Sequence, residues 1–340
     1  MTYPVIRPYR LGGGGGGPVG LLVPSGPIFT FQGQPWRYKG VSAFKLCHRF
    51  TAGEDITPFL NAYAGFNVLR VWDYVGDGWG ADKWDSNTPD EWIAFIRYVG
   101  AFGWWVELTL LTDDDHTRIG PATGLVNALS TADVDNVLLE AGNEPTTHKH
   151  INTAALEPAL DASGFPYCSG DYEDSDRWYG SYYTCHTART HDWCRRSHDL
   201  LEFYTGVGPD KPTKPHHVPC LGDEPGKWSD VGTDRREWRA YFGGCAIMGG
   251  GGTFHSETGK LGEPPNSIEQ GCIAWALEGL DAFPANVPGG KYNRIVEPDQ
   301  SPTARTYVVG NCMVRSQQDG TEAPEPGWTA IDADGVLFTR

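Results

Sequence analysis

Residues 66–111 read FNVLRVWDYVGDGWGADKWDSNTPDEWIAFIRYVGAFGWWVELTLL, and this stretch decides the fold. It begins with the apolar run 66–72 and ends with the apolar run 104–111, each of which has the length of a buried strand. Between them, Thr88 and Glu91 form a capping box that predicts the start of a helix. Apolar residues then recur at helical spacing and predict one buried face, made of Trp92, Phe95, Ile96 and Val99. A strand, a helix and a strand in this order predict parallel pairing through a crossover helix.

Similar runs extend this pattern along the chain. We expect strands at 38–46, 66–72, 104–111, 136–141, 167–168, 181–186, 217–222 and 246–254. Eight such units over roughly 220 residues predict an α/β fold of the (β/α)8 TIM-barrel type rather than an open sheet. The dinucleotide fingerprint GxGxxG does not follow the first strand, which argues against a Rossmann fold.

The chain divides into three predicted parts. Residues 1–27 contain six consecutive glycines and are expected to form a flexible lead-in. Residues 28–285 are expected to form the barrel, with a hairpin near residues 28–38 covering its bottom. Residues 286–340 are rich in proline and strand-like runs and predict a small β-rich C-terminal extension, with strands at 306–315 and 336–340.

The composition excludes several classes of function. The 340 residues hold 27 Lys and Arg against 43 Asp and Glu, a formal net charge of −16, which argues against nucleic acids and anionic membranes as partners. No apolar run reaches the length of a membrane span. The N-terminus lacks the apolar stretch of a signal peptide, although an extracellular or virion-associated location is favoured over a cytoplasmic one. The oligomeric state stays open.

The eight cysteines form no CxxC pair and no zinc-type spacing. Three lie in apolar runs and are expected to pack as small hydrophobic residues: Cys220, Cys245 and Cys272. Three others lie close together in a polar stretch, where one disulfide is an open alternative: Cys168, Cys185 and Cys194.

Two glutamates follow apolar strands in matching contexts. Glu144 lies in VLLEAGNEP at 137–145, and Glu224 lies in VPCLGDEPG at 218–226. The carboxyl ends of barrel strands form the rim where active sites lie, and strands four and seven stand on opposing sides of that rim. Two facing carboxylates suit cleavage of a glycosidic bond, with one protonated as the acid and the other ionised. A separation of roughly 5–5.5 Å would give retention through a covalent intermediate.

On these motifs, the stretch from Trp36 to Pro284 resembles the clan A glycoside hydrolases, the (β/α)8 retaining enzymes that include cellulases, mannanases and β-galactosidases. The resemblance implies that Glu144 is the general acid/base and that Asn143 hydrogen-bonds the sugar 2-hydroxyl. It implies that Glu224 is the nucleophile. Arg70, in the second strand, matches the family arginine that orients the nucleophile and keeps it ionised.

The resemblance includes one further match and two departures. Tyr183 or His186 matches the aromatic or histidine residue that the family has on its sixth strand. Pro225 stands where the family has an aromatic residue after the nucleophile, and Phe254 and His255 stand where it often has a tryptophan on strand eight. These departures affect the subfamily more than the reaction.

Further residues are candidates for substrate contact. Four glycines precede His255, so the backbone there can approach a bulky group. His48 follows the first strand and is either a substrate contact or part of a structural loop. Trp72 and Trp228 could stack on sugar rings, although many tryptophans of the chain are expected to be core.

Several carboxylates have competing interpretations. Asp223 is a rival to Glu224, since alternation along a strand aims only one of them inward. Glu107 and Glu140 could reach the rim, but satisfied interior pairs are favoured. The run from Asp113 to His116 could bind Ca²⁺, but a solvated rim loop is favoured, and no metal or cofactor is expected.

The sequence therefore predicts a retaining β-glycoside hydrolase whose partner is an oligo- or polysaccharide. The main alternative is a barrel that binds glycan without cleaving it, as a structural component of a larger assembly such as a phage virion or fibre. A metal-dependent hydrolase on the same barrel is a weaker third interpretation.

Overall fold

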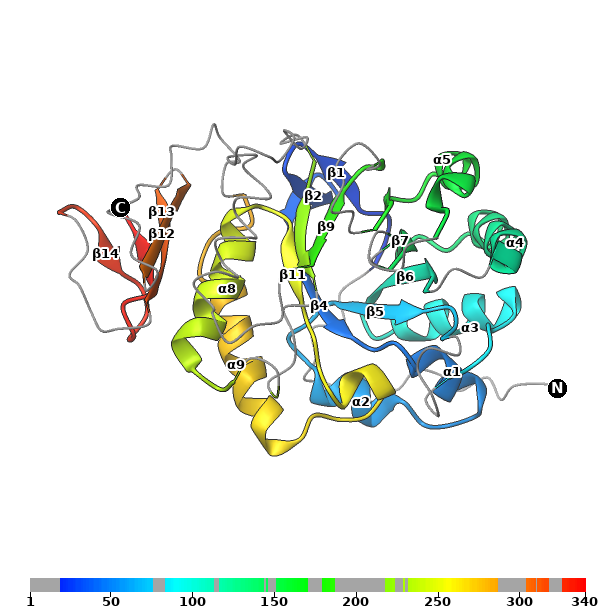
Figure 1. The fold of residues 1–340 in the computed structure, drawn as a ribbon, viewed down its shortest axis with the longest axis horizontal. Helices are drawn as coiled ribbons and strands as arrows, with labels where there is room; N and C mark the ends of the chain where they lie inside the picture. The colour runs from blue at the N-terminus through cyan, green and yellow to red at the C-terminus, as the bar shows by residue number, and fades with distance from the viewer. Residues whose placement is uncertain are drawn as a thin grey trace.

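The computed structural model describes residues 19–75, 83–112, 116–143, 145, 151–170, 179–186, 218–223, 229, 232–286, 304–309, 311–317 and 326–340. Its main feature is an eight-stranded parallel sheet (Figure 1). The strands are β4 (Tyr38–Ser42), β5 (Val68–Trp72), β6 (Trp105–Leu111), β7 (Val137–Gly142), β8 (Tyr167–Cys168), β9 (Tyr183–His186), β10 (Cys220–Asp223) and β11 (Gly251–Phe254). The predicted (β/α)8 barrel is confirmed.

The sheet order is β8-β7-β6-β5-β4-β11-β10-β9, so the first and the eighth barrel strands, β4 and β11, are neighbours. At the two ends of this order, Ser181 N donates to Tyr167 O over 2.8 Å, which joins the segment before β9 to β8. The sheet therefore closes almost completely on itself. In this order β7 and β10, the fourth and seventh strands, lie on opposing sides.

Helices surround the sheet in Figure 1. They are α1 (Leu46–Thr51), α2 (Thr57–Ala62), α3 (Pro89–Gly100), α4 (Ile119–Thr131), α5 (Glu157–Ser163), α8 (Arg235–Ile247) and α9 (Ser267–Asp281), with short 3₁₀ turns at His116–Arg118, Thr153–Ala155 and Gly259–Leu261. The predicted capping box is confirmed, since Glu91 N donates to Thr88 Oγ1 over 3.4 Å and Thr88 N donates to Glu91 Oε2 over 2.7 Å. The predicted face of α3 is buried.

Two predicted strands run into an adjoining helix. The first strand ends at Ser42 rather than at residue 46, because Leu46 and Cys47 are the buried face of α1. The eighth begins at Gly251 rather than at residue 246, because Ala246 and Ile247 extend the buried face of α8. Glycines after that helix make the turn into the strand, and Gly249 has a φ of +93°.

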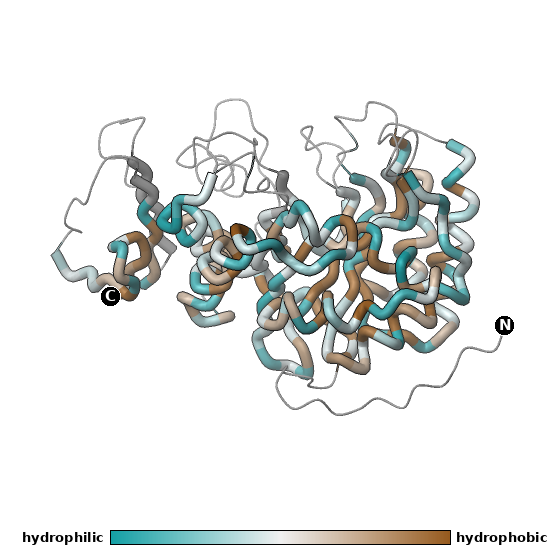
Figure 2. The backbone as a smooth tube through the Cα atoms, turned by 90° about the horizontal axis from the view of Figure 1, so that it is seen from below, coloured by the Kyte–Doolittle hydropathy of each residue, from teal (hydrophilic) through white to brown (hydrophobic). Residues whose placement is uncertain are grey.

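Side chains alternate between the two faces of the barrel strands, as β geometry requires. On β5, Leu69 and Val71 pack in the large apolar core with the helices. Val68, from the same strand, packs instead in a second cluster inside the barrel. Figure 2 shows hydrophobic stretches both along the strands and on the helices around them.

An N-terminal sheet covers the bottom of the barrel, as the sequence predicts. Its strands are β1 (Val23–Ser25), β2 (Ile28–Phe31) and β3 (Gln34–Trp36), and β1 lies inside the stretch 1–27 that was expected to be a flexible lead-in. Phe29 and Leu22 join the cluster inside the barrel, and Trp105 Nε1 donates to Gly20 O over 2.7 Å. The lower end of the barrel is therefore filled, and chemistry belongs at the other end.

The C-terminal segment forms a four-stranded antiparallel sheet in the order β12-β13-β15-β14. Its strands are β12 (Ala304–Val309), β13 (Cys312–Gln317), β14 (Thr329–Ala330) and β15 (Leu337–Thr339). The predicted single strand over 306–315 is wrong, because the chain reverses between Val309 and Cys312, where the sequence reads Gly-Asn. The sheet packs against α8, where a Cβ on Gly243 would lie 2.5 Å from Leu337 Cδ2. The division at residues 27 and 285 stays a prediction.

Closure of the barrel between β4 and β11 depends on a glycine, which gives a test. A Cβ on Gly251 would lie 1.9 Å from Tyr38 O, and its φ is +123°. We expect Gly251→Ala to lower the free energy of unfolding by more than about 3 kcal/mol, through a clash and backbone strain. Gly124→Ala, in α4 with nothing within 4 Å of the added carbon, should stabilise by about 0.5–1 kcal/mol. Urea unfolding compares them, and equal effects would contradict this closure.

Candidate active site

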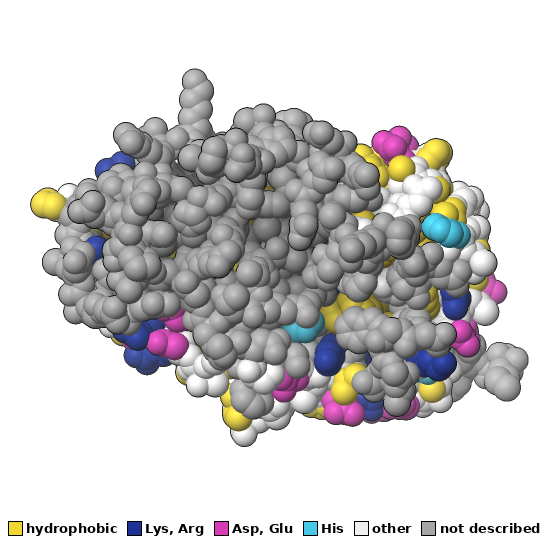
Figure 3. All heavy atoms as spheres, in the orientation of Figure 1, with side chains coloured by type: hydrophobic (Ala, Val, Ile, Leu, Met, Phe, Trp, Pro, Cys, Tyr) yellow, Lys and Arg dark blue, Asp and Glu magenta, His cyan; other side chains and the backbone are white. Residues whose placement is uncertain are grey.

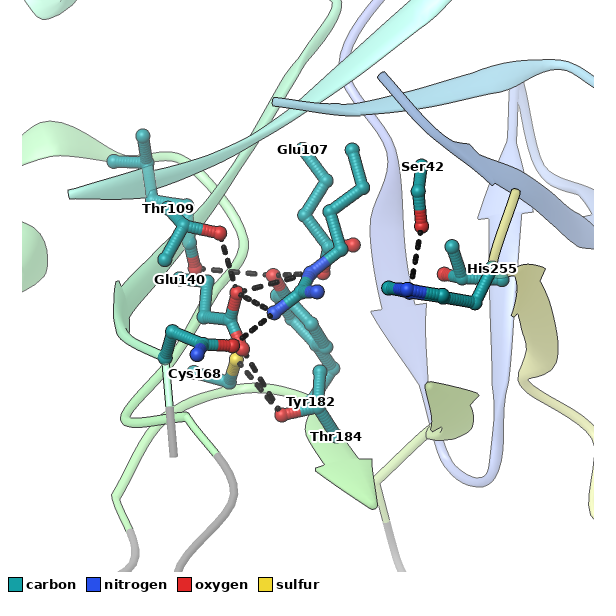
Figure 4. A network of polar contacts seen from close by, with 12 residues as sticks. Ser42, Glu107, Thr109, Glu140, Cys168, Tyr182, Thr184 and His255 are labelled. Atoms are coloured by element: carbon teal, nitrogen blue, oxygen red, sulfur yellow. Dashed lines mark hydrogen bonds and ion pairs between the residues drawn. The ribbon is translucent and has the colours of Figure 1, made fainter. Parts of the chain in front are cut away.

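A buried ion pair crosses the interior of the barrel. Arg70, on β5, donates from Nη2 to Glu140 Oε2, on β7, over 2.7 Å, and from Nε to the same oxygen over 3.2 Å. Both side chains are 0% exposed. Thr109 Oγ1 donates to Glu140 Oε2 over 2.5 Å, and Thr184 Oγ1 donates to Oε1 over 3.5 Å. Figure 4 shows both threonines pointing toward Glu140.

The alternation and the register of the strands bring these residues together. Arg70 lies beside Glu107 in the β5–β6 ladder, and Thr109 lies beside Glu140 in the β6–β7 ladder. Val68 and Leu138 lie two residues earlier on β5 and β7 and pack inside the barrel. Arg70 and Glu140 therefore share the inner face, one layer closer to the carboxyl ends of the strands.

Asn143 connects this layer to the rim. Its Oδ1 accepts from Arg70 Nη2 over 3.0 Å, and its backbone N donates to Leu111 O over 2.8 Å. The side chain is buried, with 2% exposed. Because Arg70 holds the carbonyl end of the amide, the NH₂ end is left as the donor toward other groups.

A second carboxylate lies lower in the barrel. Glu107 accepts from Tyr38 Oη over 2.5 Å and from Tyr182 Oη over 2.8 Å. Burial raises the pKa of Tyr182 well above its ordinary value, and the nearby Cys168 and Glu107 raise it further, so this phenol remains protonated. The favoured interpretation of Glu107 and Glu140 as satisfied interior groups is confirmed.

An aromatic wall, made of Phe44, Trp72 and His255, stands beside Arg70. The rings of Phe44 and Trp72 stack with centroids 3.8 Å apart at 11°. The Arg70 guanidinium carbon lies 5.6 Å from the Phe44 centroid and 5.9 Å from that of Trp72. The ring centroids of His255 and Phe44 lie 5.7 Å apart. The Nδ1 atom of His255 is 3.3 Å from Ser42 Oγ, a contact that Figure 4 shows. Three predicted residues, Arg70, Trp72 and His255, therefore lie together.

The loop that follows His255 is fixed by a buried carboxylate. Glu269 Oε1 accepts from Ser256 Oγ and from Glu257 N, each over 2.6 Å. Its Oε2 accepts from Thr258 Oγ1 over 2.6 Å. Glu269 is also part of the capping box of α9, so the start of this helix and the end of β11 are tied together.

Two predicted contact residues are not available to a substrate in this structure. Trp72 is 1% exposed because Phe44 covers its face, so its ring is part of the wall and cannot stack on a sugar. Tyr183 is 3% exposed and packs in the core between strands and helices. Its neighbour Tyr182 packs inside the barrel, which places Tyr183 on the opposite face. Both expectations are wrong.

Other predicted residues are placed differently. His48 lies in α1, half-buried, with its ring centroid 6.5 Å from that of Trp84. Glu144, Glu224 and Trp228 lie outside the described residues, as does the side chain of His186, and their roles stay predictions.

The structure tests only part of the sequence alternatives on metals and cysteines, and the side chain of Cys185 lies outside the described residues. Among the described residues, no group of three His, Cys, Asp or Glu side chains could hold a metal ion, and residues 113–115 lie outside. Cys220, Cys245 and Cys272 are free and buried, as expected. Cys168 is also a free, buried thiol, while Cys194 lies outside the described residues. No helix in the described part is long and apolar enough to cross a membrane.

Sequence reasoning missed several residues of the site, and alternation could have found some of them. An even number of residues separates each of three such side chains from a neighbour along its strand that packs inside the barrel. They are Ser42, Thr109 and Thr184. Asp73 had no such signal. It follows β5, is 4% exposed and accepts from Trp92 Nε1 over 2.8 Å. Burial raises the pKa of its carboxyl from 3.8 to about 6, although that hydrogen bond opposes the shift.

The described barrel is similar to solved glycoside hydrolases. A β-1,4-D-mannanase from Cryptopygus antarcticus matches at 12% identity and a TM-score of 0.50, covering 76% of this chain and 94% of the mannanase. A glycoside hydrolase family 5 protein from Bacteroides vulgatus matches at 12% identity and a TM-score of 0.52. The match covers 87% of this chain and 80% of that protein. A β-glucanase from Saccharophagus degradans matches at 11% identity and a TM-score of 0.52. The match covers 81% of this chain and 97% of the glucanase.

At these identities the likeness shows the fold alone. The predicted resemblance to clan A glycoside hydrolases is confirmed for the barrel. No protein-family model matches the chain, and no curated protein matches it in sequence.

The buried pair gives a prediction on stability. Glu140→Gln removes the negative charge beside Arg70 in a site with no exposure, and we expect a loss of about 3–5 kcal/mol in the free energy of unfolding. Asp281→Asn is the matched control, since Asp281 is 60% exposed in its pair with Lys39 and should cost at most about 1 kcal/mol. Equal losses in urea unfolding would show that the barrel pair has no special role.

Asp73 gives a prediction on pH. Its carboxyl binds a proton more tightly in the folded protein than in the unfolded chain, so folding stability falls as the pH rises from about 4 to about 6. Asp73→Asn keeps an oxygen for Trp92 Nε1 and removes this loss. We expect the variant to gain stability over the parent across that range, reaching about 2–3 kcal/mol above pH 6. A pH-independent difference in thermal or urea unfolding would refute this assignment.

Proposed function

We propose that this chain is a retaining glycoside hydrolase that cleaves β-glycosidic bonds, with Glu144 as acid/base and Glu224 as nucleophile. The observation that supports this most strongly is the Arg70–Glu140 pair with Asn143. It fixes the end of β7 directly before Glu144, at the end of the barrel opposite to the filled one. The backbone of β10 ends at the same rim, directly before Glu224.

The proposed reaction has two displacements. In the first, the Glu224 carboxylate attacks the anomeric carbon while Glu144 gives its proton to the leaving glycosidic oxygen. The bond from carbon to that oxygen breaks, and a covalent glycosyl ester forms on Glu224. In the second, Glu144 takes a proton from water, and the water oxygen displaces the carboxylate from the same carbon. Two inversions give retention.

The described residues would support each step. The Arg70 cation, held by the aromatic wall and by Glu140, would favour the ionised form of a carboxylate that lies close to it at the rim. The Asn143 amide, whose oxygen is held by Arg70, has its NH₂ end to donate to a sugar hydroxyl. His255, a member of the wall that precedes the loop held by Glu269, is a further donor or acceptor. No cofactor is required by these steps.

The neighbouring structures suggest where to look for a substrate. Their names describe a β-1,4-D-mannanase and a β-glucanase, so β-linked mannan and glucan backbones are the first substrates to test.

Asp223 remains the rival nucleophile. Leu221 packs inside the barrel, and Asp223 follows two residues later in the ladder with His186. Asp223 is the last residue of β10, whereas Glu224 follows the end of the strand, and alternation would aim only one of the two inward. The resemblance of the motif favours Glu224, so both positions belong in the test.

Three isosteric variants separate these roles. We expect Glu144→Gln to lower kcat on natural glycans by about 10²–10⁴-fold, because the leaving oxygen loses its proton donor. Its first displacement should stay fast on a dinitrophenyl glycoside, whose leaving group needs no proton. Glu224→Gln should abolish turnover of both substrates, while Asp223→Asn keeps most activity. Released reducing ends and dinitrophenolate are the two readouts.

Other outcomes have defined meanings. An inactive Asp223→Asn with an active Glu224→Gln would move the nucleophile to Asp223. Glycan binding by the parent chain with no released reducing ends would overturn the hydrolase proposal and favour the non-catalytic barrel in a larger assembly. Unchanged thermal unfolding of each variant is the control for folding.

A further inference from the structure

A group of hydrogen-bond donors lies beside the aromatic wall, at the same end of the barrel. It is formed by Lys45, His48, Trp84 and Asn87, and we call it the donor cluster. Lys45 Nζ lies 5.9 Å from the centroid of the Trp84 ring, and the His48 ring lies 6.5 Å from it. Thr51, at the end of α1, donates to Asn87 Oδ1 over 2.9 Å and so brings Asn87 to the same helix.

Two donors of this cluster have no acceptor among the described residues. They are the buried Trp84 Nε1 and Asn87 Nδ2 atoms. Within the described part of the chain, no hydrogen bond or ion pair reaches the half-buried ammonium of Lys45. Its neighbours differ, since Arg49 pairs with Glu54 over 2.6 Å and Lys39 pairs with Asp281 over 3.2 Å.

This arrangement is unusual for a chain with a net charge of −16. A cation with so many carboxylates available is normally paired, and buried N–H groups are normally satisfied. The contact of Lys45 with the face of Trp84 explains the position of the ammonium, but it satisfies neither the indole N–H nor the Asn87 amide. Within the described residues, the cluster therefore offers one cation and two N–H groups without an acceptor.

The position of the cluster relates it to the proposed site. Lys45 follows the carboxyl end of β4, and its backbone N donates to Lys260 O in the loop after β11. Trp84 packs in one apolar cluster with Phe44 and Trp72 of the aromatic wall. Figure 3 shows a histidine and basic side chains next to hydrophobic ones in the lower part of the face it presents.

We propose that the donor cluster binds an anionic group carried by the glycan, a carboxylate or a sulfate ester, so that the substrate is an acidic glycan. This inference rests on the proposed function. It adds a charged substituent to the β-linked backbones named above. An oxyanion offers only acceptors, which is the complement of a cation and two unsatisfied N–H groups. The negative charge of the whole chain opposes a dense polyanion and favours a glycan with isolated charges.

The experiment measures binding rather than turnover, so that the anionic subsite and the hydrolase activity can be tested separately. The full chain with Glu144→Gln is titrated in a calorimeter with three tetrasaccharides of the same β-1,4 backbone, in a glucose and a mannose series. One is neutral, one carries a single uronate carboxylate, and one carries a single 6-sulfate. We expect at least a tenfold lower Kd for one of the charged ligands than for the neutral one, and the ligand that shows it identifies the source of the anion.

The role of Lys45 in binding the anion is tested with two substitutions that change the net charge of the chain equally. Lys45→Met should reduce the ratio of neutral to anionic Kd from tenfold or more to about twofold or less. Lys39→Met, whose lysine lies outside the barrel in an exposed pair, should leave that ratio unchanged. Raising the salt concentration should lower the ratio in the parent chain and not in Lys45→Met.

Defined results overturn the inference. A ratio near one in the parent chain, no binding of any charged ligand, or the same change in both lysine variants would each do so. Hydrolysis of neutral glycans with a ratio near one would leave the proposed function intact and remove only the anionic subsite. Tight binding of charged ligands without hydrolysis by the unsubstituted chain would leave the subsite and remove the proposed function.

Discussion

The buried contact between Arg70 and Glu140 is the constraint on which the rest of the site depends. Removing two charges from water is costly, and the cost is recovered only when geometry is good and the remaining hydrogen-bonding groups are satisfied. Here Thr109 and Thr184 reach the carboxylate, and Asn143 and the aromatic wall reach the guanidinium. The pair therefore fixes β5, β6 and β7 relative to one another and orients the residue that precedes Glu144.

The interior of the barrel changes character along its axis. At the bottom it is filled by aromatic and aliphatic side chains, with the N-terminal sheet as cover. Glu107 and its two tyrosines form a satisfied polar layer above that filling. The next layer holds the charged pair, and the rim holds Asn143 and His255. The charged and polar groups of the described barrel therefore lie toward the carboxyl ends of the strands, away from the filled bottom.

Much of this architecture could be predicted from the sequence, because buried strands and capped helices carry strong local signals. The strand at 167–168 and the capping box at Thr88 are found where they were expected. The first and eighth strands were predicted too long, because apolar residues of the adjoining helix continue the apolar run of the strand. Periodicity alone could not distinguish the two.

The site was harder to predict than the fold. Arg70 and Asn143 were proposed from motifs, and His255 from the glycines before it. Tyr183 packs away from the barrel interior, because its neighbour Tyr182 packs inside the barrel. Trp72 lies beside the site but is enclosed by Phe44, and only packing in three dimensions reveals that. The donor cluster joins α1 to residues after β5 and has no motif at all, since its members are recognised by what they fail to contact.

Double displacement by two carboxylates at this rim would retain the configuration of the anomeric carbon. Proton NMR of the first product formed from a β-linked oligosaccharide tests this most directly, because the anomeric signals report configuration before mutarotation. We expect the β-anomer to appear first and the α-anomer to grow only as the sugar equilibrates. Initial release of the α-anomer, or no product from any β-linked glycan, would contradict it.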